Sequence, residues 1–248
     1  MLDDRVNDKV YIHEFIDIIG RHRSDYVYHM LANYSPIAQD ERGQQCFGVW
    51  GTIGSTGRWP QVVNLWEENG FDGLAASFGH ETGNPAMQDP KLAQWWARAA
   101  QFRSGGTDRI LVPAPWSRPI DALVGAGVRG VVYAHELVVV PPGQAVRYLD
   151  GVGELAPGVT ASFGWQLAGA WRTAMSDDSE CLILWAIPSW PQWAAFEQEA
   201  TRTLGLGRPA GAEVRSAQRI LLVDAPLSPM RTGRQPSRAD RLEPYEEA

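Results

Sequence analysis

Two histidines stand at equivalent places in a short pattern that the chain contains twice. His13 lies in the run VYIHE, and His135 lies 122 positions later in the run VYAHE. A tyrosine, Tyr11 or Tyr133, stands two positions before each histidine. Because side chains of a strand alternate between its two faces, the Tyr and His of each run share one face. Histidine can transfer protons near neutral pH, and tyrosine can donate a hydrogen bond or a proton, so we predict that these four residues are catalytic.

The opposite face of the same two runs carries Glu14 and Glu136. Only one of the two faces can line a barrel interior, and burial there would raise the pKa of a glutamate toward that of a general base. The aliphatic neighbours of Glu14 favour packing of that face on helices, so we prefer the Tyr and His face for a pocket. As an alternative, the two histidines are hydrogen-bonded structural residues of the core.

The chain has eleven tryptophans, and we single out four that lie on expected strands. Tryptophan is bulky and amphipathic, which suits ligand pockets and interfaces as well as cores. We predict that the four line a pocket for a small apolar or aromatic molecule, and core packing is an equally good interpretation of each one taken singly. The candidate substrate-binding residues are Trp50, Trp66, Trp165 and Trp185.

The sequence lacks the local motifs of common cofactor and metal sites. It contains no His-Glu-x-x-His, Cys-x-x-Cys or Gly-x-Ser-x-Gly spacing. The G-x-G-x-x-G at 125–130 opens an expected strand rather than a helix, so it does not indicate a dinucleotide site. We therefore predict neither cofactor nor metal, with a metal held across both halves by His13, His135 and an acid as an alternative. His80 and Glu81 form a third His–Glu pair in an expected polar loop, where an insertion could form a lid or a site.

Further matches to the first part of the chain follow in the same order in its second part. They indicate two copies of one unit, and a long period with two copies is typical of a duplicated domain. The matched runs are Phe47-Gly48 with Phe163-Gly164, Leu65-Trp66 with Leu184-Trp185, and Arg109-Ile110-Leu111 with Arg219-Ile220-Leu221. The predicted divisions are a first repeat at 9–115, a linker at 116–127, a second repeat at 128–225, and a tail at 226–248 that is disordered or wraps the surface of a neighbour.

Hydrophobic periodicity predicts the order β-α-β-β-α-β in each repeat. This order is typical of the ferredoxin-like unit, an antiparallel four-stranded sheet with helices on one face. Two such sheets can hide their second faces by closing into an eight-stranded α/β barrel with the helices outside, an α+β fold within one chain. Strands are expected at 9–19, 45–53, 61–67, 109–112, 130–140, 160–173, 180–187 and 214–223. Helices are expected from Ser24 until Pro36 and Gly43, at 70–78, from Pro90, at 143–155 and from Ser189.

Composition and charge argue against several classes of partner. A net charge of −7 without a basic stripe argues against nucleic acid, and no apolar run is long enough to span a membrane. Cys46 and Cys181 are interpreted as buried free thiols of a reducing compartment, and the N-terminus lacks a signal-peptide region, so we expect a cytoplasmic protein. An exposed sheet edge of either half could pair chains into a homo-oligomer.

Three of the expected strands resemble the NIPSNAP family. The resemblance rests on a first strand with a tyrosine, the FGVW of the second strand, and the VVNLWE run at 62–67 of the third. The family belongs to the dimeric α/β-barrel superfamily, with antibiotic-biosynthesis monooxygenases, polyketide cyclases and EthD-like proteins. The family usually has Glu-Leu-Arg on the first strand, where this chain has Ile-His-Glu and Ala-His-Glu, so the superfamily resemblance is the stronger one.

Taken together, these patterns favour a small-molecule enzyme with a pocket in the barrel. We expect cofactor-free acid–base chemistry on an apolar or aromatic compound, such as cyclisation, isomerisation or lyase chemistry, with oxygenation as a variant. The alternative is a non-catalytic binding or scaffold protein, which the NIPSNAP resemblance allows. Because this superfamily hosts many chemistries, the interior of the barrel decides between the two hypotheses.

Overall fold

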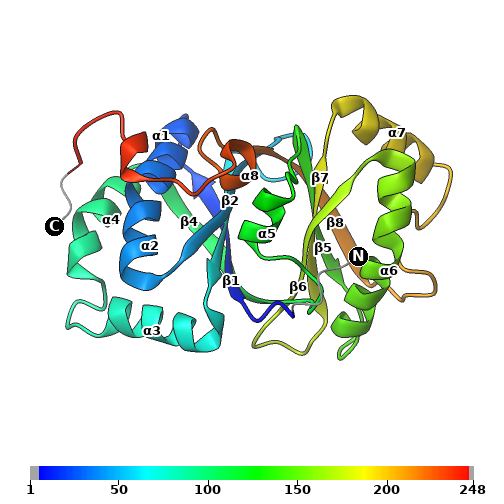
Figure 1. Ribbon diagram of the computed structural model, residues 1–248, viewed down its shortest axis with the longest axis horizontal. Coiled ribbons are helices and arrows are strands. Elements are labelled where there is room, and N and C mark those ends of the chain that lie inside the picture. Colours follow the sequence, from blue (N-terminus) through cyan, green and yellow to red (C-terminus); the bar gives the residue numbers. More distant parts are fainter. Residues whose placement is uncertain (1–5, 246–248) are drawn as a thin grey trace.

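Antiparallel strands close into a barrel at the centre of the molecule, and helices flank it on two sides (Figure 1). The computed structural model describes residues 6–245 of the chain. Around the barrel the strand order is β1-β3-β2-β8-β5-β7-β6-β4. The strands are β1 (Val10–Ile18), β2 (Gln45–Thr52), β3 (Gln61–Glu68), β4 (Arg103–Pro113), β5 (Val132–Val139), β6 (Gln166–Thr173), β7 (Glu180–Ile187) and β8 (Ser216–Asp224).

Each half of the barrel has the ferredoxin-like strand order that the sequence predicts. In the first half, β1 lies between β3 and β4, and in the second half β5 lies between β7 and β8. Two shorter seams, β2 with β8 and β4 with β6, join the halves. The predicted fold class, an α+β eight-stranded barrel within one chain, is therefore confirmed.

The second strands of the two halves match at a Gly-x-Trp motif. Gly48 of β2 lies opposite Leu65, and Gly169 of β6 lies opposite Leu184. A β-bulge precedes each glycine, and a tryptophan follows two residues later. In both places the tryptophan ring covers the glycine so closely that a Cβ there would overlap ring atoms.

Two of the matches predicted from the sequence are wrong in register. Phe163 ends a helix and Gly164 is the left-handed cap of that helix, with a φ of 73°, so this pair is not the counterpart of Phe47-Gly48. In the closing strands, Leu111 lies opposite Tyr11 and Leu222 lies opposite Tyr133. The counterpart of Leu111 is therefore Leu222 rather than the predicted Leu221. Short sequence matches tolerate such slips because neighbouring strand residues are similarly apolar.

The helices differ from expectation mainly in length. The first helical segment does not stop at Pro36, which instead lies in the first turn of α2, and it ends at Gly43, whose φ is 63°. The expected strand at 160–173 begins six residues late because α6 continues to Phe163. The helices are α1 (Arg23–Tyr28), a π-helical stretch (His29–Tyr34), α2 (Ser35–Arg42), α3 (Gly70–Thr82), a 3₁₀ turn (Pro90–Leu92), α4 (Ala93–Ala99), α5 (Ile120–Gly125), α6 (Ala145–Phe163), α7 (Trp190–Ala200), α8 (Pro229–Thr232) and a 3₁₀ turn (Arg238–Asp240).

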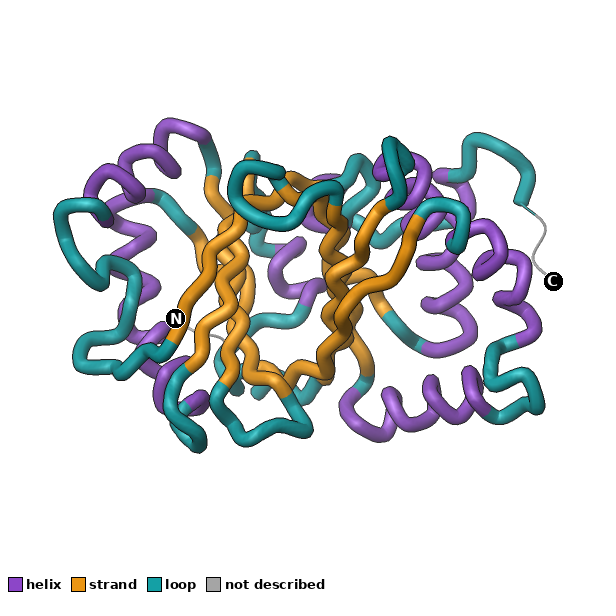
Figure 2. The backbone as a smooth tube through the Cα atoms, turned by 180° about the vertical axis from the view of Figure 1, so that it is seen from behind, coloured by secondary structure: helices purple, strands orange, loops and turns teal. Residues whose placement is uncertain are grey.

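The expected linker contains a helix that closes one end of the barrel. Ile120 and Leu123 of α5 are fully buried and pack against the side chains inside the barrel. Seen from behind, the strands surround the centre of the molecule and α5 lies behind them (Figure 2). Met230 of α8 packs against the same cluster. We call this end of the barrel the closed end.

Buried apolar residues form three clusters, one inside the barrel and one between each half-sheet and its helices. Alternation along each strand sends successive side chains to the interior and to the helices, which is why both faces of β3 and β7 are buried. We call the three the interior cluster, the first helix layer and the second helix layer. The interior cluster includes Tyr11, Phe47, Trp50, Val63, Leu65, Tyr133, Trp171, Leu182 and Leu184.

The described part of the tail, to residue 245, packs on the first half of its own chain. The Gln235 side chain bonds both the backbone N–H and the C=O of Cys46, at 3.0 and 2.9 Å, as a neighbouring strand would. Gln39 donates to the Pro236 carbonyl at 2.9 Å. Residues 246–248, which the predicted tail includes, lie outside the described residues.

Within residues 6–245, no helix is both long enough and apolar enough to cross a membrane. Cys46 and Cys181 are both buried free thiols, as the sequence predicts. Burial raises the pKa of each thiol, strongly for Cys46 and to about 12 for Cys181. Neither is therefore poised as a thiolate nucleophile at neutral pH.

Replacing Gly48 or Gly169 by Ala should destabilise the protein by about 1–3 kcal/mol, because the added methyl group must displace a fully buried tryptophan ring. Thermal unfolding measures the effect. The matched control is Gly79→Ala, on an exposed part of α3 with no atom near the new Cβ. That change should be neutral or stabilising by up to about 1 kcal/mol. Equal melting temperatures for Gly48→Ala and Gly79→Ala would contradict the packing described for the Gly-x-Trp motif.

Candidate functional site

His13 and His135 meet at the centre of the barrel. Their strands, β1 and β5, stand four places apart in the eight-strand order and so face each other across the interior. The two Nε2 atoms are 2.9 Å apart, and the ring centroids are 5.0 Å apart. The side chains are 0% and 2% exposed. The structure therefore brings together the two residues that the repeated pattern singled out.

Both histidines are neutral at pH 7. Burial, together with the charges of His135 and Arg109, holds the pKa of His13 well below its usual value. Burial likewise lowers the pKa of His135 to about 3. A neutral imidazole has one N–H and one bare nitrogen, so one ring must donate from Nε2 and the other must accept. The pair is thus a ready-made combination of one hydrogen-bond donor and one acceptor.

Two buried polar atoms beside the pair have no hydrogen-bond partner among the described residues. They are Nδ1 of His13 and Nη1 of Arg109. His13 and Arg109 lie directly opposite each other in the register of β1 and β4, so their side chains share the interior face. Leaving a buried polar group unpaired costs about 1–3 kcal/mol each. A carbonyl or phenolic oxygen placed between the two would satisfy both when His13 Nδ1 carries its proton.

We call the end of the barrel opposite α5 the mouth. The half-buried ring of Phe15 lies edge-on to both histidines, with centroid distances of 4.7 Å to His13 and 5.3 Å to His135. The guanidinium carbon of Arg109 lies 5.8 Å from the centre of the Phe15 ring, and Arg109 donates to Glu180 at 2.7 Å. One aromatic side chain and an ion pair therefore lie near the histidines on this side.

The tyrosines face the interior as predicted, but their hydroxyl groups form hydrogen bonds at the closed end of the barrel rather than beside the histidines. The Tyr11 hydroxyl donates to Glu67 at 3.0 Å and accepts from Asn7 at 2.9 Å. The Tyr133 hydroxyl accepts from the backbone N–H of Gly130 at 3.0 Å. Burial raises the pKa of both tyrosines, so they remain protonated. They can donate hydrogen bonds but cannot act as bases near neutral pH.

Two acids accompany the tyrosines, the buried Glu67 and the half-buried Asp224, and neither is among the site residues predicted from the sequence. Glu67 also accepts from the backbone N–H of Ile120 at 2.9 Å, and burial raises its pKa. Asp224 lies next to Tyr133, and burial raises its pKa to about 6, although the Tyr133 hydroxyl partly offsets the effect. The inward position of Glu67 could have been predicted from the sequence. Val63, Leu65 and Glu67 are spaced by two on the same strand, so their side chains point to the same face.

The four candidate tryptophans do not share one pocket. Trp50 is in the interior cluster, whereas Trp66 lies in the first helix layer. Trp165 and Trp185 lie in the second helix layer. The interior counterpart of Trp50 is Trp171, which the sequence analysis did not single out. A role in an interior pocket therefore stays a prediction for Trp50 and does not extend to the other three.

The glutamates next to the histidines face the helices, in agreement with the preferred orientation. Glu14 accepts from Trp66 at 2.8 Å and from Asn64 at 2.9 Å. Glu136 pairs with Arg219 at 2.6 Å. Both glutamates thus belong to the layers between sheet and helices, and the histidine face lines the interior.

His80 lies on the last turn of α3, not in a loop, and joins a network of charges. Its Nε2 is 2.9 Å from Asp89 and 3.8 Å from Glu41, a grouping compact enough for a metal ion. However, Arg42 already pairs with Asp89 at 3.1 Å, and Lys91 pairs with Glu41 at 3.2 Å. Side-chain cations therefore already balance both carboxylates.

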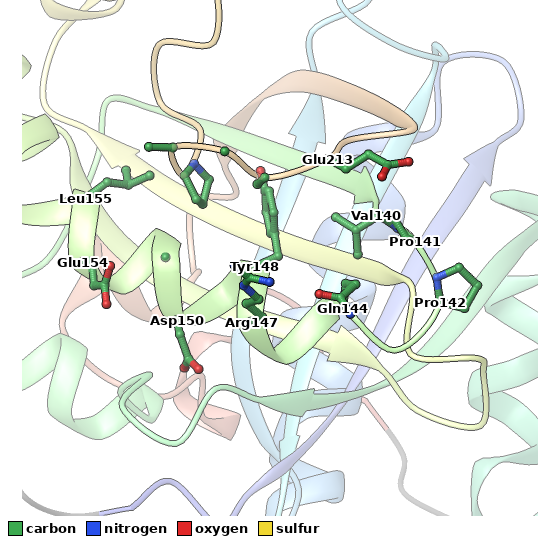
Figure 3. Close-up of a pocket in the computed structure, with 15 residues that line it drawn as sticks. Val140, Pro141, Pro142, Gln144, Arg147, Tyr148, Asp150, Glu154, Leu155 and Glu213 are labelled. Carbon is green, nitrogen blue, oxygen red and sulfur yellow. The ribbon is translucent and has the colours of Figure 1, made fainter.

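Two cavities of more than about 700 Å³ lie outside the barrel, within the size range of ligand sites, and neither histidine lines them. The first, of about 820 Å³, lies between α6 and the loop at 209–213. Figure 3 shows Tyr148 of α6 rising toward this loop, with Asp150 and Glu154 on the same helix. The second, of about 770 Å³, lies between α5 and α6.

Solved structures with low sequence identity share the fold. An anthrone oxidase-like protein matches with a TM-score of 0.58 at 8% identity, covering 88% of this chain and 92% of that chain. A proposed monooxygenase from Lactobacillus acidophilus matches with a TM-score of 0.52 at 12% identity, covering 88% and 94%. The chain therefore shares the α/β-barrel fold of these structures, with both halves of the barrel in one polypeptide, as the resemblance implied.

A NIPSNAP-like domain protein from Burkholderia xenovorans also matches, with a TM-score of 0.35 at 18% identity, covering 45% of this chain and 90% of that chain. At this score the match adds no argument about function. No protein-family model matches the chain, and the search of curated proteins found no match.

The histidine pair should show strong coupling in a double-mutant cycle. His13→Leu alone leaves the buried Nε2 of His135 without a partner and should cost about 1–3 kcal/mol. Replacing both histidines by Leu removes the unpaired atom and should restore most of that loss. Urea unfolding at pH 7.5 measures the cycle. Additive single and double effects would show that the two rings do not bond each other.

The pair should also make stability depend on pH. The folded pKa values lie below 6.5, so below pH 6.5 the unfolded chain binds more protons than the folded chain. The contribution of the pair is full above about pH 6.5 and should fall by up to about 1.4 kcal/mol per pH unit for each histidine as pH drops. The measurement is the difference in free energy of unfolding between wild type and the double Leu variant at each pH. The buried carboxylates are present in both proteins, so their contributions cancel in this difference. A constant difference from pH 7.5 to 5 would contradict it.

Proposed function

We propose that the chain is a small-molecule enzyme that uses His13 and His135 as an acid–base pair inside the barrel. The substrate would be an apolar or aromatic compound with a carbonyl or phenolic oxygen, and the reaction would need no cofactor. The observation that carries the proposal is the set of polar atoms that converge beside the pair. The neutral histidine pair, the unpaired Nδ1 of His13 and the unpaired Nη1 of Arg109 all belong to side chains that point into the barrel.

The protonation states suit proton transfer at neutral pH. One ring offers a bare nitrogen as a base, and the other offers an N–H that can polarise a developing oxyanion, as a neutral imidazole can. The Arg109 guanidinium adds a fixed positive charge beside that oxygen. Tyr11 and Tyr133, which stay protonated, would bound the substrate from the closed end. The proposed step is removal of a proton next to a carbonyl group.

Substrate would enter through the mouth. The Phe15 ring covers both histidines and is itself half-buried, so rotation of one side chain uncovers them. Leu137, the residue of β5 equivalent to Phe15, is also half-buried. A bound aromatic ring could take the place of the Phe15 ring against the imidazoles. Because the substrate would replace an aromatic side chain, we expect it to be apolar or aromatic.

A second candidate function is non-catalytic binding or scaffold work. It is favoured by the packing of the interior, where large side chains such as Trp50, Phe47 and Trp171 are fully buried. In that case the histidine pair is a hydrogen-bonded element of the core. The two candidates differ in whether the double Leu variant loses a chemical activity or only a contribution to stability.

Anthrone in air is a suitable first probe, because it is aromatic and loses a proton from a CH₂ group that is conjugated with its carbonyl through the flanking rings. The deprotonated anthrone and O₂ then give anthraquinone and water. Wild-type protein should accelerate the formation of anthraquinone, followed by absorbance, and His13→Leu/His135→Leu should lose about 10²–10⁴-fold of the rate. Arg202→Ala, on the exposed surface, serves as the control and should keep the wild-type rate. A double variant as fast as wild type would refute the role of the pair. Absence of both binding and acceleration would favour the non-catalytic candidate.

A further inference from the structure

The cleft between α5 and α6 has walls made of small residues. Ala122 of α5 and Ala126 at the end of that helix line a space of about 770 Å³ together with Gly153 and Ala156 of α6, a volume within the range of ligand sites. The indole of Trp116 covers Gly153, where a Cβ would lie 2.9 Å from the ring. The cleft therefore offers an aromatic wall and, along the two helices, small side chains. Such a lining suits an apolar body.

Arg118 is the one charged residue among the fifteen that line the cleft. It is half-buried, and among residues 6–245 it has neither a hydrogen bond nor an ion pair. Burial lowers the pKa of its guanidinium, but an arginine keeps its charge at any physiological pH. A partly desolvated cation without a counter-ion is unfavourable, so a bound anion would relieve the cost.

The other polar groups of the cleft are mostly committed to the fold. The Ser117 hydroxyl accepts from the backbone N–H of Ala170 at 3.2 Å, which fixes the segment that leads to Arg118. The Thr160 hydroxyl donates to the Trp165 carbonyl at 2.6 Å. The guanidinium of Arg118 is thus the one charged group left for a ligand, with the side-chain amide of Gln166 also on the wall of the cleft.

We propose that this cleft binds an apolar molecule that carries a single carboxylate, with the carboxylate on Arg118 and the apolar body along α5, α6 and Trp116. A planar guanidinium pairs with a carboxylate through two parallel hydrogen bonds. One arginine balances one negative charge, so a monocarboxylate fits better than a phosphate dianion. The site lies outside the barrel and does not depend on the proposed function of the histidine pair.

Calorimetric titration with decanoate and decanol tests the site, because the two probes share the apolar chain and differ in charge. Wild-type protein should bind decanoate about tenfold to a hundredfold more tightly than decanol. Arg118→Met should lose this preference and keep its affinity for decanol. Ala161→Trp, on the exposed rim of the cleft, should weaken both probes because the indole fills the space.

The double histidine variant separates this site from the barrel. It should bind decanoate as wild type does, since it changes no residue that lines the cleft. Equal wild-type affinities for decanoate and decanol would overturn the proposal, as would a preference that survives Arg118→Met. Failure of wild type to bind either probe would overturn it too. Loss of decanoate binding in the double histidine variant alone would place the ligand in the barrel instead.

Discussion

The structure depends on the need of each half-sheet to bury two apolar faces. Helices cover one face of each four-stranded sheet, and the other face can be hidden only against the other half. Closure is achieved through two seams, β2 with β8 and β4 with β6, each with three pairs of residues in register. The aromatic interior cluster, with Trp50 and Trp171 fully buried, supplies the apolar burial that these short seams need.

Closure also explains why equivalent residues meet. Because β1 and β5 are four places apart around the barrel, their inward side chains face one another, and His13 contacts His135. The two halves then differ around this pair. Arg109 of the first half corresponds in register to Ile220 of the second. The two-fold arrangement therefore creates the pair, and the asymmetric arginine gives one side of it a positive charge and an unpaired donor.

The alternation of residues along β1 correctly predicts which side chains face the barrel interior. The same kind of pattern does not predict which tryptophans face the interior. The period of two placed Tyr11 and His13 on one face, and the aliphatic neighbours of Glu14 showed which face packs on helices. On β3 and β7 both faces are buried, so hydrophobicity alone could not distinguish inward from outward positions. Trp66 and Trp185 were assigned to a pocket for this reason, whereas they pack under helices.

The sequence by itself determined the strands, their ferredoxin-like order, and the shared face of each Tyr–His pair, because these properties follow from the spacing of neighbouring residues. Tertiary structure alone decided that the two histidines touch, that α5 closes the barrel, and that Arg118 faces a cleft of small residues. Each of these features joins segments far apart in the chain. Their contacts depend on how the sheets close and how the helices pack, which local periodicity does not encode.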